Sequence, residues 1–308
     1  MADAPRLTII GMGFRGTSFG LAVRAAKRGW RVVGHDLSHD AAGKAKKLGA
    51  LDSAEWNLPA AVEPADLVVV ATPVTAVASG FRDIAPLLKP GSVGTDLAPT
   101  KAAVLRMADE ILPESVSFVG GHPLVEPTEA ELTDAKPSAK LFEGCDWCIV
   151  PSERAAAHAV DRVSVLARSV GASPLFIEAA EHDSYVAATG ELPILLATAL
   201  TNVLLEGPAA REFGRFAGEG FRAATRSVSD APSALAGAAL TNAASLRRWL
   251  DVCRAELDEL ASLFASAETS EAEAAAVADQ LRAIGERART RVGRLRRRPL
   301  RGRRARNA

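Results

Sequence analysis

The stretch RLTIIGMGFRG, residues 6–16, decides the fold of the first half of this chain. Five residues of strand character lead into a glycine-rich turn, and a helical pattern follows before a second strand, WRVVGHD, residues 30–36. Gly11, Gly13 and Gly16 make the pattern G-x-G-x-x-G within this unit. The first glycine permits the tight turn, the second lets the backbone approach a pyrophosphate, and the third allows close packing of helix on strand. The unit predicts a Rossmann-type dinucleotide-binding domain.

The type of dinucleotide follows from the end of the second strand. Asp36 lies 20 residues after Gly16, where a carboxylate hydrogen-bonds the adenosine ribose and repels a 2′-phosphate. Leu37 and Ser38 supply no arginine for such a phosphate, so NAD is favoured over NADP. This spacing disfavours the alternative that Asp36 only caps a turn. We predict no metal site and seven cofactor-binding residues, of which the last two end a later strand: Gly11, Gly13, Phe14, Gly16, Asp36, Thr72 and Pro73.

Strand and helix patterns alternate until about Glu178 and then give way to helices alone. The later strand patterns are DLVVVATPV, GSVGTDL, SVSFVGGHP, CDWCIVP and ASPLFIEAA. Such alternation predicts a doubly wound parallel sheet with right-handed crossovers. From His182 onward the patterns are Ala- and Leu-rich and helical. We therefore expect a Rossmann domain over residues 1–179, an all-α domain over 180–292 and a basic tail over 293–308.

The charge of the chain is unevenly distributed. The formal net charge is zero, but the segment from Arg282 to the end holds 12 arginines and a single acid, Glu286. The rest of the chain carries 25 basic and 36 acidic side chains. The tail has too little apolar content to fold alone, and no nucleic-acid-binding fold accompanies it. A disordered, solvated end is favoured over contact with nucleic acid or an anionic membrane.

The sequence also predicts a cytoplasmic protein. The start, MADAPR, runs straight into a strand pattern and lacks the parts of a secretory signal. The longest apolar stretch, residues 185–205, is interrupted by Glu191, Pro193 and Asn202, so a buried helix is favoured over a membrane span. Three cysteines are too few for a disulfide framework.

Eight motifs in collinear order extend this interpretation over nearly the whole chain, from Leu7 to about Val292. They are GMGFRGTSFGLAV, DLVVVATPV, TDLAPTKAAV, FVGGHPLVE, LFEGCDW, AAEHDSYVAA, ELPILLATAL and GEGFRAATR. With these motifs the chain resembles the prephenate and arogenate dehydrogenase family, the oxidoreductases of tyrosine biosynthesis. The resemblance implies a helical C-terminal domain that forms a homodimer, with the active site between the Rossmann and helical domains.

The resemblance also implies a reaction, the NAD-dependent oxidative decarboxylation of a cyclohexadienol, prephenate or arogenate. Hydride goes to the nicotinamide, and carbon dioxide leaves as the ring becomes aromatic. His122, in GGHP, matches the catalytic histidine that hydrogen-bonds the substrate hydroxyl, because a neutral imidazole is available near pH 7. Arg226, in GFRAATR, matches an arginine that clamps a substrate carboxylate. For Lys101, near the cofactor, we expect no direct role.

Several positions on the substrate side depart from the family pattern. Pro99 stands where the family usually has a serine that helps to hold the catalytic histidine, and proline cannot replace that hydrogen bond. Residues 190–194 read Gly-Glu-Leu-Pro-Ile where the family commonly has Ser-His-Leu-Pro-His. Beside an anionic substrate Glu191 would be repulsive unless protonated or paired. Glu191 is therefore a candidate substrate-binding residue that would pair with the amino group of arogenate. The alternative is that Glu191 points into a helix interface.

These departures leave two other functions open. The first is a paralogous NAD(P)-dependent dehydrogenase of another small carboxylated hydroxy compound, with His122 kept for the same proton chemistry. The second is a catalytically weak dinucleotide-binding regulator. His122 and Arg226 argue against the regulator, whereas Pro99, Glu191 and Ile194 favour one of these alternatives. No regulatory domain follows the helical one, so we expect little feedback control by tyrosine.

Overall fold

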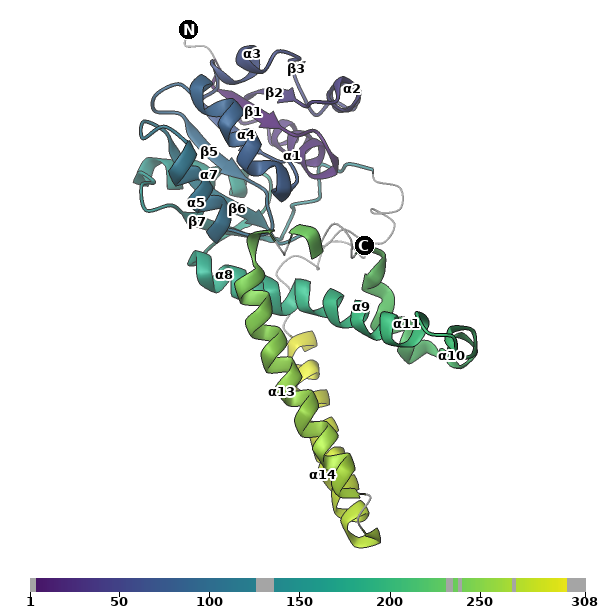
Figure 1. Ribbon diagram of the computed structural model, residues 1–308. Coiled ribbons are helices and arrows are strands. Elements are labelled where there is room, and N and C mark those ends of the chain that lie inside the picture. The colour runs from purple at the N-terminus through teal and green to yellow at the C-terminus, as the bar shows by residue number, and fades with distance from the viewer. Residues whose placement is uncertain (1–3, 126–135, 231–234, 238–239, 268–269, 298–308) are drawn as a thin grey trace. The chain divides into compact units, whose positions relative to one another are not determined.

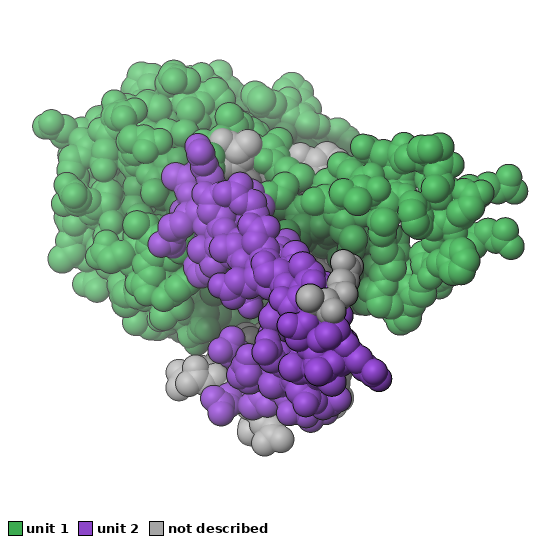
Figure 2. Space-filling view, turned by 60° about the horizontal axis from the view of Figure 1, so that its bottom comes forward, with its two compact units in different colours: residues 1–243 green, residues 244–308 purple. Residues whose placement is uncertain are grey.

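The computed structural model describes residues 4–125, 136–230, 235–237, 240–267 and 270–297. The chain divides into two compact units, Met1–Ala243 and Ala244–Ala308, which are coloured separately in Figure 2. Unit 1 holds the sheet and the helices as far as η4. Unit 2 holds nearly all of α13 (Ala243–Ala267) and the whole of α14 (Glu271–Arg297).

Unit 1 is built on one eight-stranded sheet with the order β3-β2-β1-β4-β5-β6-β7-β8. The strands β1 to β6 pair in parallel, β7 runs antiparallel to β6, and β8 is parallel to β7. Their bounds are β1 Arg6–Ile10, β2 Arg31–His35, β3 Ser53–Ala54, β4 Leu67–Val70, β5 Val93–Asp96, β6 Ser117–Pro123, β7 Asp146–Pro151 and β8 Ser173–Phe176. The Rossmann-type fold is confirmed, with one correction to the all-parallel sheet.

The register of β6 and β7 shows how β7 comes to run antiparallel. Pro123, at the end of β6, lies opposite Trp147, at the start of β7. β7 therefore starts at the end of the sheet where β6 finishes. A parallel strand would start at the opposite end and would need a crossover connection.

Helices cover both faces of the sheet (Figure 1). One face packs against α1 (Phe14–Ala25), α2 (His39–Lys47) and α7 (Ala157–Ser169). The other packs against α3 (Leu58–Val62), α4 (Val77–Ile84) and α5 (Ala102–Ile111). Successive residues of β4 enter the two cores in turn, as a strand buried on both faces requires: Leu67 and Val69 face one core, Val68 and Val70 the other.

The glycine turn has the geometry that the sequence predicts. Gly11 has a φ of 96°, a conformation that favours glycine, and its N–H donates to the His35 carbonyl at 2.9 Å. A Cβ atom added at Gly16 would lie 1.9 Å from the Gly11 carbonyl oxygen, so only glycine lets α1 start this close to the strand. A Cβ atom added at Gly13 would meet no atom within 4 Å.

A long helix follows the sheet. It consists of α8 (Ala179–Val186), the π-helical segment η3 (Ala187–Glu191) and α9 (Leu192–Leu205). Its length and composition would allow it to cross a membrane, with a mean hydropathy of 1.4. One such helix is weak evidence for a membrane span. The prediction of a buried helix is wrong for the single chain, because only 11% of the most apolar window is buried.

Three short elements follow the long helix: α10 (Ala210–Phe216), α11 (Glu219–Thr225) and η4 (Arg226–Asp230). In unit 2, α14 continues to Arg297, so residues 293–297 of the predicted disordered tail are helical. Arginine is a good helix former, and basic side chains near a helix C-terminus interact favourably with the helix dipole. Residues 298–308 of that tail lie outside the described residues.

The turn geometry gives a stability prediction. We expect Gly16→Ala to lower the free energy of unfolding by about 1–3 kcal/mol, because the added methyl group must displace α1 or the turn. The matched control is Gly13→Ala, whose methyl group points into open space and should change that free energy by less than about 0.5 kcal/mol. Urea unfolding followed by circular dichroism measures both. Equal stabilities of the two variants would contradict the packing role of Gly16.

Candidate active site

The predicted cofactor residues gather at the carboxyl ends of β1, β2 and β4. A Cβ atom on Gly11 would lie 2.9 Å from the Thr72 backbone nitrogen, so the two turns are in contact. Asp36 Oδ2 accepts the Met12 N–H at 2.6 Å, and Oδ1 accepts the Ser38 N–H at 2.7 Å. Asp36 therefore does order its own turn, and it also holds the glycine turn. Each oxygen keeps accepting capacity, so its ribose contact stays a prediction.

Two observations show that this turn fits a dinucleotide. The space beside Gly13 is open at the N-terminus of α1, where backbone N–H groups and the helix dipole favour a phosphate. The Thr72 hydroxyl is buried and has no hydrogen-bond partner among the residues that the structure describes, so it can serve a ligand. Phe14 packs against the core, and Pro73 begins the turn η1 (Val74–Ala76); their cofactor contacts also stay predictions.

A buried ion pair lies at the carboxyl ends of β5 and β6. Asp96 and the ammonium group of Lys101 are in direct contact, and both side chains are 0% exposed. Asp96 Oδ1 also accepts the Gly121 N–H at 2.9 Å, while Lys101 Nζ donates to the Gly121 carbonyl at 2.9 Å. The pair thus holds both polar groups of Gly121, the residue before His122. The expectation of no direct role for Lys101 stays a prediction.

The close packing of β6 against its neighbours explains the two glycines of GGHP. A Cβ atom at Gly121 would lie 2.6 Å from the Asp96 carbonyl oxygen and 2.9 Å from Trp147 Nε1. A Cβ atom at Gly120 would lie 3.0 Å from the Val150 carbonyl oxygen. Any side chain here would push β6 away from its neighbours and move His122.

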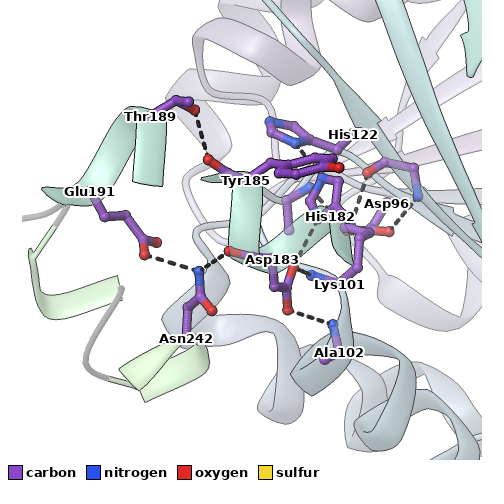
Figure 3. A network of polar contacts seen from close by, with 12 residues as sticks. Asp96, Lys101, Ala102, His122, His182, Asp183, Tyr185, Thr189, Glu191 and Asn242 are labelled. Atoms are coloured by element: carbon purple, nitrogen blue, oxygen red, sulfur yellow. Dashed lines mark hydrogen bonds and ion pairs between the residues drawn. The ribbon is translucent and has the colours of Figure 1, made fainter. Parts of the chain in front are cut away.

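His122 is the first member of a chain of polar contacts (Figure 3). Its Nδ1 lies 2.9 Å from His182 Nε2, and His182 Nδ1 lies 2.8 Å from Asp183 Oδ1. His182 and Asp183 belong to α8, so the first turns of that helix complete the site formed by the sheet. All three side chains are buried, and His122 is 8% exposed.

The environment of His122 keeps its imidazole neutral. Burial lowers the pKa of His122 well below 6.5, and the nearby positive charge of Lys101 lowers it further, with smaller contributions from His182 and Arg15. A neutral imidazole has one nitrogen with a lone pair, which can accept a proton. Since Nδ1 is engaged with His182, Nε2 is the nitrogen available to a substrate.

Asp183 is fixed by two elements besides His182. Its carboxylate accepts backbone N–H groups at the start of α5, from Lys101 at 2.7 Å and from Ala102 at 2.8 Å. The amide of Asn242 donates to the Asp183 carbonyl at 2.9 Å and to Glu191 Oε2 at 3.0 Å. Glu191 is therefore buried against Asn242, on the side of Asn242 away from His122 in Figure 3. Burial raises the pKa of Glu191 to about 7.

The structure brings only some of the predicted substrate residues together. His122 lies in the network just described, which includes Glu191 only through Asn242. Arg226 is exposed at the junction of α11 and η4. Pro99 is half-buried in the loop between Asp96 and Lys101. The substrate contacts of Arg226 and Glu191 stay predictions.

Sequence reasoning missed four residues of this network. His182 and Asp183 stand in the motif AAEHDSYVAA, where a histidine beside a carboxylate is a residue combination typical of polar sites. Asp96 ends a strand, the position at which ligand-binding side chains of parallel sheets gather. Asn242 carries no such signal, because its contacts depend on a segment 59 residues away.

Two family models cover most of the chain. Residues 19–175 match the model described as "Prephenate dehydrogenase, nucleotide-binding domain", and residues 178–275 match "Prephenate dehydrogenase, dimerization domain". The first match alone spans more than half of the chain. The nucleotide-binding assignment of the Rossmann domain is thus confirmed.

Individual relatives agree with the two models. A prephenate dehydrogenase of Bacillus subtilis is 28% identical over 259 residues, 82% of this chain and 68% of its own length. A cyclohexadienyl dehydrogenase of Zymomonas mobilis is 29% identical over 262 residues, 84% of this chain and 88% of its own length.

A solved structure has the same fold. The prephenate dehydrogenase of A. aeolicus, in complex with hydroxyphenyl propionate and NAD+, superposes with a TM-score of 0.78 at 22% identity. The match covers 93% of this chain and 98% of that one. With the glycine turn, the buried histidine of GGHP and both family models in place, this chain belongs to the prephenate dehydrogenase family.

Proposed function

We propose that this chain is an NAD-dependent dehydrogenase that oxidatively decarboxylates prephenate or arogenate. The observation that carries the proposal is the neutral, buried His122, held by the Asp96–Lys101 pair at the carboxyl edge of the sheet that also carries the dinucleotide turn. The relatives with these names match over more than four fifths of the chain.

His122 handles the proton of the substrate hydroxyl. As the ring carbon that bears the hydroxyl loses its hydride, the O–H proton moves toward Nε2 of His122 and a carbonyl forms. The carbon–carboxylate bond then breaks, its electron pair enters the ring, and the phenol oxygen takes the proton back from His122. Carbon dioxide is the second product, and the proton count at His122 is restored. Aromatisation drives the reaction, so the protein mainly positions the groups.

The bound cofactor supplies the hydride acceptor. The residues that would hold it are those of the glycine turn, Asp36 at the ribose, and Thr72 with Pro73 at the end of β4. The Asp36 carboxylate favours NAD, because a 2′-phosphate beside it would be repelled.

We also propose that the enzyme acts as a cytoplasmic homodimer through its helical domain. Leu196, Leu200 and Val203 lie on one side of α9 and are 37%, 38% and 78% exposed in the single chain. A second copy of the chain would cover this apolar face, which accounts for a long apolar helix without a membrane. The described cysteines are free, as in a reducing compartment.

The first prediction concerns His122. Purified protein is given NAD with prephenate and then with arogenate, and formation of reduced nicotinamide is followed by absorbance. We expect turnover of at least one substrate, and a fall in kcat of about 10²–10⁴-fold in His122→Asn, because the proton acceptor is lost. The dissociation constant for NAD should stay within about twofold, since His122 lies outside the glycine turn.

Two results would contradict the proposal. One is cofactor binding without turnover of either substrate by the wild-type protein. The other is an unchanged kcat in His122→Asn, which would remove His122 from the proton chemistry. The matched control is His158→Asn, which carries the same substitution on an exposed position of α7 and should leave kcat unchanged.

The second prediction concerns Glu191 and pH. Because burial raises its pKa to about 7 from 4.5, the folded protein holds this proton more tightly than the unfolded chain. The destabilisation from ionised Glu191 is therefore absent below about pH 4.5, grows between pH 4.5 and 7, and is complete above pH 7. Glu191→Gln keeps an acceptor for Asn242, so at pH 8 we expect it to exceed the wild type in unfolding free energy by up to about 3 kcal/mol.

Urea unfolding at pH 8 and at pH 5 measures this difference, which should shrink at the lower pH. The matched control is Glu259→Gln, on an exposed position of α13, which should change the free energy of unfolding by less than about 0.5 kcal/mol. A Glu191→Gln protein less stable than the wild type at pH 8 would show that ionised Glu191 has a stabilising partner.

A further inference from the structure

We infer that His182 and Asp183 are positioning residues that fix the tautomer of His122, so that its Nε2 faces the substrate without a proton. This inference rests on the proposed function, in which His122 is the proton acceptor. Neither residue touches the reacting atoms, because each acts through the imidazole of His122.

Hydrogen-bond donors on both oxygens of Asp183 stabilise its ionised form. Oδ1 accepts the Lys101 N–H at 2.7 Å and Oδ2 accepts the Ala102 N–H at 2.8 Å. Both donors stand at the N-terminus of α5, where the helix dipole favours a negative charge. With both oxygens accepting hydrogen bonds, Asp183 is an ionised carboxylate and can only accept.

The charge of Asp183 fixes the tautomer of His182. The contact of 2.8 Å between Asp183 Oδ1 and His182 Nδ1 requires the imidazole to donate, so the His182 proton is on Nδ1. In a neutral imidazole Nε2 of His182 is then the acceptor. The contact of 2.9 Å with His122 must therefore be donated by His122 Nδ1. This leaves the lone pair of His122 on Nε2.

The chain of contacts also stabilises the protonated state of His122 during the reaction. The charged groups around His122 include the positive Lys101 and Arg15, which oppose protonation. Lys101 is already paired with Asp96, whose carboxylate also binds Gly121 and Ala98. Asp183 is the carboxylate that is connected to the His122 ring itself, through His182. Its negative charge offsets part of the positive charge that appears on His122 when Nε2 takes a proton.

Asp183→Asn tests this inference directly. The Asn amide can donate to His182 Nδ1, which moves the His182 proton to Nε2 and forces the His122 proton onto its own Nε2. We expect kcat to fall about 10²–10⁴-fold while the dissociation constant for NAD stays within about twofold. In ¹⁵N NMR spectra of the histidine side chains, His122 should show protonated Nδ1 in the wild type and protonated Nε2 in the variant.

The matched control is Asp66→Asn. Asp66 also accepts a backbone N–H, from Arg6 at 2.7 Å, and a side-chain donor, Lys89 Nζ at 2.7 Å, at the start of β4. The Asp66→Asn variant should have the kcat and the His122 tautomer of the wild type. A folded Asp183→Asn protein with wild-type kcat, or with an unchanged His122 tautomer, overturns the inference.

A pair of His182 variants tests the same inference if Asp183→Asn does not fold. Gln at position 182 offers an oxygen to His122 Nδ1–H, whereas Leu of similar size offers none. We expect His182→Gln to keep a kcat at least about tenfold higher than His182→Leu; equal values contradict the tautomer role. Because the NMR measurement needs no turnover, it tests this inference even if the wild type proves inactive on both substrates.

Discussion

The site depends on the buried ion pair between Asp96 and Lys101. Two opposite charges without exposure to water must be paired and hydrogen-bonded, or each would destabilise the fold by several kcal/mol. The polar groups that satisfy this pair come from Gly121 in the neighbouring strand. The requirement to satisfy buried charge thus fixes the backbone that carries His122. Removing either charge would leave the other one buried and alone.

The same short segment also receives the helix that completes the site. The backbone N–H groups of Lys101 and Ala102, at the start of α5, bind the carboxylate of Asp183 from α8. One loop therefore positions His122 from beneath through Gly121 and positions Asp183, with its neighbour His182, from the side. Because this loop positions both His122 and Asp183 through other groups, a proline at position 99 is tolerated. The histidine is held by a second histidine and by its own backbone, so a serine hydroxyl in this loop is not needed to orient it.

How much of this was readable from the sequence differs between the two halves of the site. The glycine turn, Asp36 and the alternation of strands and helices are local signals, because each depends on residues within one strand–helix–strand unit. His122 was found through its motif. By contrast, the contacts of His122 with His182 and of Asp183 with Lys101 join residues 60 and 82 positions apart. No spacing rule encodes such contacts, and they emerge only when α8 packs against the end of the sheet.

Glu191 lies at the far end of this network. Its place in the family pattern suggested a contact with substrate, and in the single chain its carboxylate accepts a hydrogen bond from Asn242. It ends the π-helical segment Ala187–Glu191, whose wider turn rotates the residues after it relative to a regular helix. The side on which such residues lie cannot be read from a period of 3.6, because that period assumes a regular helix.

The surroundings of His122 make it a weak base. Asp96 and Asp183 direct their carboxylates to internal donors. Burial and the positive charge of Lys101 lower the pKa of His122 and keep its imidazole neutral. For most proton abstractions weak basicity would be a disadvantage. Here the proton is needed only while the ring passes through its carbonyl form and returns to oxygen once the ring is aromatic. A weak base that is correctly oriented, and that releases its proton readily, is therefore sufficient.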